Sequence, residues 1–190
     1  MKRNLKKMLF GAVVAFVAVS FIGCSNPSDT PVGGNGSGIT LPTVADVLPG
    51  IQVGENVWGS GSNINKTGDY YTITSGKGWD PNGSASIPCC FDPGKISGAK
   101  GASAVVDLTN FEARPGDADY PTYELKVQIS DKEFKIFSGE LQTIVGQTFI
   151  MWVFDGTSAE AELLDKAIQA MITIRGEGTV KLSSFQFPIE

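Results

Sequence analysis

The chain has 190 residues, of which 15 are basic, 20 are acidic and none is histidine, so its formal net charge is −5 at pH 7. Without histidine, the chain cannot form Ser-His-Asp or Cys-His catalytic sites or histidine-based zinc sites from its own residues. Its length fits one domain that buries a core of ordinary size.

The first twenty-four residues have the pattern of an export signal. Four basic residues within positions 2–7 precede an apolar run over residues 8–23, which stops at Cys24. A basic start, a short apolar run and a small residue before the cut are typical of a secretory leader. The alternative is an uncleaved anchor helix, which needs roughly 20 apolar residues, more than this run supplies.

The end of the leader, Phe21-Ile-Gly-Cys24, resembles the lipobox of bacterial lipoproteins, although Phe21 stands where Leu is usual. The resemblance implies cleavage before Cys24 and attachment of diacylglycerol and palmitate to that residue. We therefore expect a lipid-anchored protein of the bacterial cell envelope, at the outer membrane or the cell surface. Its contact with the membrane would be through the lipid anchor only.

Cleavage would leave 167 residues, with 11 basic residues against 20 acidic ones and a net charge of about −9. Such a surface repels phosphate backbones, so we expect no nucleic acid partner. Residues 24–45 are rich in Gly, Ser, Asn and Pro, which predicts a flexible tether. Residues 46–190 are predicted to form one β-sandwich domain.

Downstream of the tether, apolar and polar residues alternate with period two between clusters of Gly, Asn, Asp and Pro, which predicts strands. One short helix is predicted over residues 160–169, because Thr157 and Glu160 have the spacing of a capping box. Eight short strands indicate an all-β sandwich of antiparallel strands. The predicted strands are residues 52–58, 70–75, 102–111, 122–130, 133–141, 148–154, 170–175 and 179–188.

Four segments carry a resemblance to a known family: Tyr71-Thr-Ile-Thr-Ser-Gly-Lys-Gly-Trp79, Tyr123-Glu-Leu-Lys-Val-Gln-Ile129, Phe149-Ile-Met-Trp-Val-Phe154 and Ile172-Thr-Ile-Arg-Gly-Glu-Gly-Thr-Val-Lys-Leu-Ser-Ser-Phe185. Together they resemble the carbohydrate-binding-module jelly rolls of the galactose-binding-like superfamily. The resemblance implies a jelly-roll β-sandwich that binds polysaccharide, often with a structural calcium near the chain ends. The end of this chain, Phe187-Pro-Ile-Glu190, lacks the acidic residue common on the last strand of those modules. We expect no cofactor, and structural calcium is left open.

A sugar-binding site needs an aromatic ring that packs on the apolar face of a sugar, with polar groups beside it for the hydroxyls. Trp152 is a candidate because both faces of its predicted strand are apolar; the alternative is that Trp152 belongs to the core. Trp79 and Trp58 stand at strand ends beside glycines, where each would either meet a ligand or close an end of the sandwich. Tyr120 lies in a Pro- and Gly-containing loop predicted to overhang the site.

Polar residues alternate along the predicted strand at 122–130 and supply Glu124, Lys126 and Gln128. Arg175 ends another predicted strand. If these strands share one sheet, the four side chains form a hydrogen-bonding floor for a ligand; the alternative is a solvated outer face.

Catalysis without histidine would need a pair of carboxylates, as in glycoside hydrolases. Glu124, Asp107, Glu140 and Asp155 are available, but their spacing selects no pair, so we expect no enzyme. The leading hypothesis is a non-catalytic carbohydrate-binding lipoprotein whose partner is a polysaccharide or other glycan. The alternatives are a structural or protein-binding, adhesin-like lipoprotein without a sugar site and, third, a glycoside hydrolase.

Cys89 and Cys90 are adjacent in the sequence. Neighbouring Cα atoms are about 3.8 Å apart, closer than an unstrained disulfide allows. Two free thiols and a vicinal disulfide therefore both remain open, and no metal site is expected from two sulfurs alone.

Overall fold

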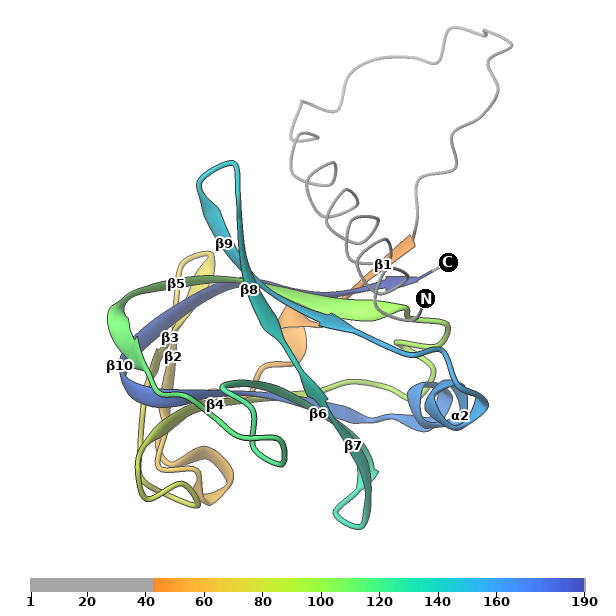
Figure 1. The fold of residues 1–190 in the computed structure, drawn as a ribbon, viewed down its shortest axis with the longest axis horizontal. Helices are drawn as coiled ribbons and strands as arrows, with labels where there is room; N and C mark the ends of the chain where they lie inside the picture. Colours follow the sequence, from red (N-terminus) through yellow and green to blue (C-terminus); the bar gives the residue numbers. More distant parts are fainter. Residues whose placement is uncertain (1–42, 190) are drawn as a thin grey trace, which may run out of the picture.

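The computed structural model describes residues 43–189, which form an antiparallel β-sandwich with one α-helix (Figure 1). The predicted all-β sandwich with one short helix is confirmed, with ten strands where about eight were expected. The strands are β1 (Thr43–Asp46), β2 (Asn63–Thr67), β3 (Tyr70–Thr74), β4 (Ser84–Cys90), β5 (Gly101–Ala113), β6 (Tyr123–Ser130), β7 (Glu133–Ser138), β8 (Glu140–Ile144), β9 (Gln147–Val153) and β10 (Gln169–Ile189).

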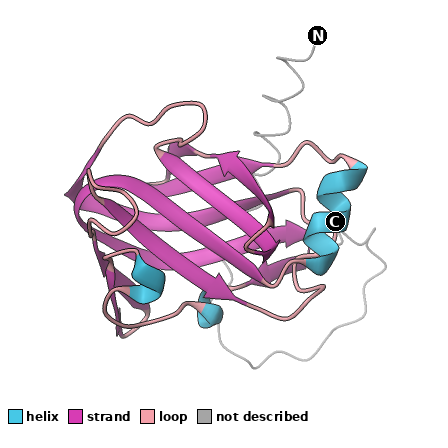
Figure 2. Cartoon of the chain, turned by 90° about the horizontal axis from the view of Figure 1, so that it is seen from below, coloured by secondary structure: helices cyan, strands magenta, loops and turns pink. Residues whose placement is uncertain are grey.

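The strands form two layers, and β10 belongs to both of them. In what we call the small sheet, the order is β4-β10-β6-β7, with β10 contributing residues 169–175. In the large sheet, the order is β2-β3-β10-β5-β9-β8, and β1 pairs with the end of β10 beyond β3. Figure 1 shows β10 turning from the lower layer into the upper one, and Figure 2 views the sandwich from the side of the lower layer.

Glycine allows β10 to bend between the sheets without ending. Gly176 and Gly178 have φ of 140° and 125°, and a Cβ atom at Gly176 would lie 2.1 Å from the carbonyl oxygen of Glu112. No other residue fits this close approach. The two strands predicted at 170–175 and 179–188 are therefore one continuous strand.

Gly139 marks the second crossing between the layers. The strand predicted at 133–141 is divided here into β7 of the small sheet and β8 of the large sheet. A Cβ atom at Gly139 would lie 2.5 Å from Nε1 of Trp152. The close packing of the chain on this indole therefore requires glycine.

The core lies between the two sheets and is built by the predicted alternation. On β6, Leu125 and Val127 are fully buried, and their neighbours on β10, Ile172 and Ala170, are buried beside them. Removing such apolar side chains from water is the main stabilising contribution to the fold. Among the largest fully buried side chains of this core are those of Trp152, Phe185, Phe187, Ile64 and Ile73.

Three strands were not predicted, and one prediction is wrong. β1, β2 and β4 are additional, whereas residues 52–58 form no strand and end in a 3-10 helix, η2 (Val57–Gly59). Asn56 and Trp58 both have left-handed backbone conformations, with φ of 47° and 55°, which cannot continue a strand. A further 3-10 helix, η1 (Leu48–Gly50), precedes this segment.

The single α-helix of the described residues, α2 (Ser158–Lys166), begins at the predicted cap. The Thr157 hydroxyl accepts a hydrogen bond from the backbone N–H of Glu160, at 3.2 Å. The Glu160 carboxylate accepts from the N–H of Gly156 and from Lys135, so it ties the helix to β7.

The predicted leader, Cys24 and nearly all of the predicted tether lie outside the described residues. The described sandwich begins at Thr43, where β1 pairs with the last residues of β10. Within residues 43–189, no helix has the length and apolar character needed to cross a bilayer.

Candidate functional site

The outer face of the small sheet carries most of the predicted site. Glu124, Lys126 and Gln128 lie on β6 with their side chains on the same face, opposite the buried Leu125 and Val127. Their partners across the sheet are Thr173, Met171 and Gln169 on β10, and Ser138, Ile136 and Phe134 on β7. Strand pairing thus arranges these side chains in three successive rows of mixed polar and apolar groups. We call this surface the floor of the site.

Aromatic side chains surround this floor. Trp58, Trp79, Tyr120 and Phe134 are 43%, 47%, 58% and 45% exposed, and they are the only exposed aromatic residues among those that the structure describes. All four line one groove with a volume of about 740 Å³. The rest of its lining is Glu124, Lys126, Gln128, Asp131, Ile136, Gln169, Met171, Thr173 and Arg175.

Two glycine-rich loops bring Trp58 and Trp79 to the same end of the groove. The N–H of Gly78 donates to the carbonyl of Ser60 at 2.9 Å, and a Cβ atom at Gly76 would lie 1.9 Å from the carbonyl carbon of Gly61. Only glycine permits this approach of two backbones. The loop of Trp58 and the loop of Trp79 are therefore packed directly against each other.

Trp58 has an unfavourable backbone conformation on this surface. A bulky residue with φ of 55° is an outlier that costs on the order of 1–3 kcal/mol. The Asn56 side chain holds the turn by accepting a hydrogen bond from the N–H of Gly61 at 2.7 Å. The loop thus keeps a tryptophan exposed in a conformation that tryptophan itself disfavours.

Arg175 fixes the position of Tyr120. Its Nε donates to the carbonyl oxygen of Tyr120 at 3.1 Å, and its guanidinium carbon lies 5.1 Å from the centre of the Tyr120 ring. The Asp117 carboxylate accepts from the N–H of Tyr120 at 2.8 Å. The loop that was expected to overhang the site is therefore held at both its backbone and its ring.

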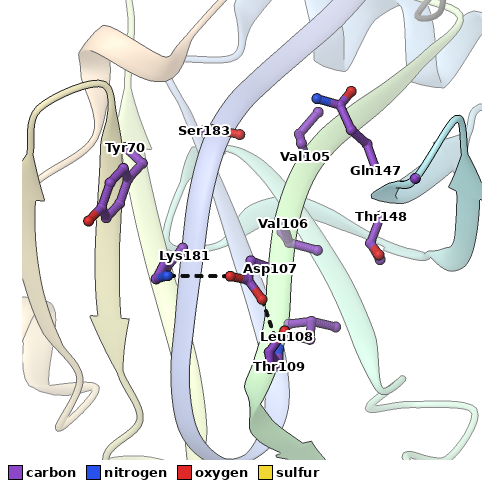
Figure 3. Close-up of a pocket in the computed structure, with 11 residues that line it drawn as sticks. Tyr70, Val105, Val106, Asp107, Leu108, Thr109, Gln147, Thr148, Lys181 and Ser183 are labelled. Carbon is purple, nitrogen blue, oxygen red and sulfur yellow. Dashed lines mark hydrogen bonds and ion pairs between the residues drawn. The ribbon is translucent and has the colours of Figure 1, made fainter.

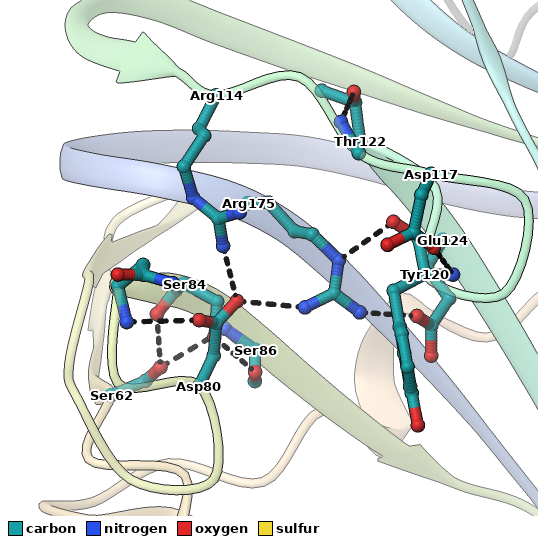
Figure 4. A network of polar contacts seen from close by, with 12 residues as sticks. Ser62, Asp80, Ser84, Ser86, Arg114, Asp117, Tyr120, Thr122, Glu124 and Arg175 are labelled. Carbon is teal, nitrogen blue, oxygen red and sulfur yellow. Dashed lines mark hydrogen bonds and ion pairs between the residues drawn. The ribbon is translucent and has the colours of Figure 1, made fainter.

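The other two nitrogens of Arg175 each donate a hydrogen bond within a buried ion-pair network (Figure 4). Nη1 donates to Asp80 at 2.7 Å and Nη2 donates to Glu124 at 2.8 Å, while Arg114 also donates to Asp80 at 2.7 Å. The side chains of Arg175, Asp80 and Glu124 are only 10%, 6% and 7% exposed. Because its nitrogens are already occupied, Arg175 is a positioning residue here.

Burial raises the pKa of the Glu124 carboxyl, and the charge of Arg175 opposes that rise. A hydrogen bond donated by Arg175 engages one of the two carboxylate oxygens of Glu124. Glu124 can therefore both hold Arg175 and accept a further hydrogen bond from a molecule in the groove.

The structure brings six of the seven predicted ligand-binding residues together. Trp79, Tyr120, Glu124, Lys126, Gln128 and Arg175 all line the groove. Trp152 does not: it is fully buried, and its indole N–H donates to the carbonyl of Tyr123 at 3.1 Å. Its strand, β9, is covered on both faces, as the alternative for Trp152 proposed.

Sequence reasoning missed Phe134, Gln169, Met171 and Thr173 as groove residues. Phe134 pairs with Gln128 across the β6–β7 hairpin, so the register of that hairpin was the available signal. Of the four carboxylates considered for catalysis, only Glu124 lines the groove, whereas Asp107 lies in a second cavity.

That second cavity, of about 530 Å³, lies on the large sheet beside β5, β9 and β10 (Figure 3). Within the described part of the chain, no three Cys, Asp or Glu side chains are grouped so that they would hold a metal ion. The two thiols of β4 are free: Cys89 is buried and Cys90 is exposed.

Comparison of the chain with family models, with curated proteins and with solved structures finds no match. The resemblance to carbohydrate-binding jelly rolls therefore stands on the strand patterns quoted above.

Proposed function

We propose that this protein is a non-catalytic carbohydrate-binding lipoprotein of the cell envelope, with its ligand site in the groove of the small sheet. The observation that carries the proposal is the gathering of every exposed aromatic side chain of residues 43–189 around one floor of mixed polar and apolar groups. Exposed aromatic residues scattered over the surface would support no such assignment.

The chemistry of the groove suits a sugar. Sugar rings have apolar C–H faces, which pack on aromatic rings, and hydroxyl groups, which need both donors and acceptors. Glu124 and Asp131 supply acceptors, Lys126 supplies donors, and the amides Gln128 and Gln169 supply both. A volume of about 740 Å³ lies in the ordinary range for small-ligand sites.

The envelope location rests on the leader and Cys24. Labelled palmitate should enter the wild-type protein in its host and should not enter a Cys24→Ser variant. Failure of the wild-type protein to take up the label would contradict the lipid anchor and leave the sugar site to be judged separately.

A glycan array probed with the full-length protein in detergent tests the sugar site. We expect binding to at least one plant, host or bacterial glycan, lost in a Trp58→Ala, Trp79→Ala double variant. A Tyr70→Ala variant is the matched control, because Tyr70 lines the cavity of the large sheet instead. Absence of binding across the array would contradict the proposal and favour a structural or protein-binding role.

Iodide quenching gives a second readout. Trp58 and Trp79 should be quenched, Trp152 should be protected, and bound glycan should protect the first two as well. Quenching that the glycan leaves unchanged would place binding elsewhere.

A further inference from the structure

The groove contains two cationic side chains that differ in what they contact. Arg175 is surrounded by Asp80, Glu124 and the Tyr120 carbonyl. Lys126 makes no ion pair or hydrogen bond with any described residue; it makes a cation–π interaction, and its charge, after that of Arg175, opposes the rise in the pKa of Glu124 that burial causes. Its Nζ lies 4.2 Å from the centre of the Phe134 ring.

Lys126 occupies the central row of the floor. Its cross-strand neighbours are Met171 on β10 and Ile136 on β7, both apolar at the side chain. The Lys126 side chain is itself partly buried. An aromatic ring stabilises an ammonium group but leaves its three N–H donors without an acceptor. A partly buried ammonium among apolar neighbours therefore favours an anionic partner.

The acidic residues of the groove do not supply this anionic partner by direct contact with Lys126. Glu124 forms its ion pair with Arg175 and acts on Lys126 only through the longer-range attraction of their charges, and Asp131, at the exposed turn between β6 and β7, forms no ion pair with Lys126. Because Asp80 and Glu124 contact Arg175 directly, Lys126 is the cation of the floor that has no carboxylate in direct contact.

We propose that the groove selects acidic saccharides, and that Lys126 binds the carboxylate of a uronic acid unit. This inference rests on the proposed function and specifies its ligand class. Rows on one face of a strand are about 6.8 Å apart, so Lys126 lies one row from Phe134 and one row from Glu124. A sugar chain that runs along the floor from Phe134 toward Tyr120 would pass over this central row and bring a carboxylate to Lys126.

Calorimetric titration of the full-length protein in detergent tests this choice. The probes are oligomers of galacturonate, glucuronate and mannuronate, each compared with its methyl ester, which has the same skeleton without the charge. We expect at least one acid form to bind about tenfold or more tightly than its ester. Raising the salt concentration should reduce that preference.

Three variants assign the preference to Lys126. Lys126→Met should bind the acid and its ester equally, and Lys126→Arg should retain the preference for the acid. Lys181→Met is the matched control: Lys181 also faces outward from a strand near an aromatic ring, 5.8 Å from the centre of Tyr70, but in the large sheet. Lys181→Met changes the net charge by the same amount as Lys126→Met, and it should leave the affinities for the acid and for its ester unchanged.

The outcomes separate the two proposals. If neutral glycans bind but no acid is preferred over its ester, or if Lys126→Met keeps the preference, the role of Lys126 is wrong and the sugar site stands. If no oligomer and no glycan on the array binds, the proposed function itself is wrong.

Discussion

The two outer faces of the sandwich each carry a cavity with a lysine or arginine and an acidic residue, but they use these groups differently. On the small sheet, Arg175 and its partners Asp80 and Glu124 are nearly buried, at 10%, 6% and 7% exposure. On the large sheet, Lys181 and Asp107 are 3.4 Å apart and both 45% exposed (Figure 3).

The pKa values of the carboxyl groups on the two faces are shifted in opposite directions. Burial raises the pKa of Glu124, whereas hydrogen bonds from Thr109 and then Lys181 lower the pKa of Asp107. The ion pairs of the small sheet are therefore withdrawn from water and hold their groups in fixed positions, whereas the ion pair of the large sheet is solvated. Both sheets carry a cavity, so a cavity alone does not distinguish the two faces. The burial of the ion pairs beside each cavity does.

The largest expected effect comes from removing Arg175. An Arg175→Met variant leaves Glu124 buried without its ion-pair partner and leaves Asp80 with Arg114 alone, which should cost about 3–5 kcal/mol of unfolding free energy. Lys181→Met on the other face should cost less than about 1 kcal/mol, because its ion pair is exposed. Urea unfolding of both variants measures the difference, and equal losses would contradict the contrast between the faces.

A smaller effect, of opposite sign, is expected where the backbone is left-handed. Trp58 beside the groove and Val145 at the tip of the β8–β9 hairpin have φ of 55° and 49°. Asn tolerates this conformation, so Trp58→Asn and Val145→Asn should each raise the unfolding free energy by about 1 kcal/mol. Only Trp58→Asn should also weaken glycan binding. Loss of stability in both variants would show that neither residue is strained.

A still smaller effect concerns pH. Because the pKa of Glu124 is raised in the folded state, the folded protein holds this proton more tightly than the unfolded chain does. The associated stability is present below the ordinary glutamate pKa of 4.5 and is lost as pH rises through the raised value. The stability of wild type relative to Glu124→Gln should therefore fall across that window, measured by urea unfolding at each pH. A difference that grows with pH would contradict this direction.

The smallest expected effect concerns the two adjacent thiols of β4, an edge strand of the small sheet, of which Cys89 is buried and Cys90 is exposed. Burial, followed by the nearby Cys90 and Asp46, raises the pKa of Cys89 to about 12, and its thiol donates to the Val47 carbonyl at 2.8 Å. At pH 8, iodoacetamide should therefore modify the exposed Cys90 and leave Cys89 intact until urea is added. Mass spectrometry of the alkylated peptides reads this out. Modification of both thiols at the same rate would contradict the assigned faces.

Much of the sandwich could be predicted because alternation reports burial directly. The strand at 122–130 is β6 almost residue for residue, since one of its faces is core. β4 was missed because Pro88 and the small Ser84 and Ser86 obscure the pattern. Pro88 is tolerated there since β4 pairs in a ladder with β10 alone. Whether a glycine ends a strand, as at Gly139, or bends it, as at Gly176, depends on packing that the sequence does not show.

The candidate site was partly predictable for the same reason. Glu124, Lys126 and Gln128 share a face by periodicity alone, and Arg175 joins them through strand pairing. Trp152 shows the limit: an apolar strand covered on both sides has the same pattern as one with an exposed aromatic face. The loop positions of Trp58 and Trp79 depend on contacts between distant backbones, which no local pattern reports.

The participation of β10 in both layers has a mechanical consequence. Its first residues build the groove floor, and its last residues pair with β1, in the register Thr43 to Ile189. A pull applied between a molecule held in the groove and the start of β1 would run along a single strand. It would load the β1 ladder in shear, with its hydrogen bonds sharing the force, instead of opening them one after another.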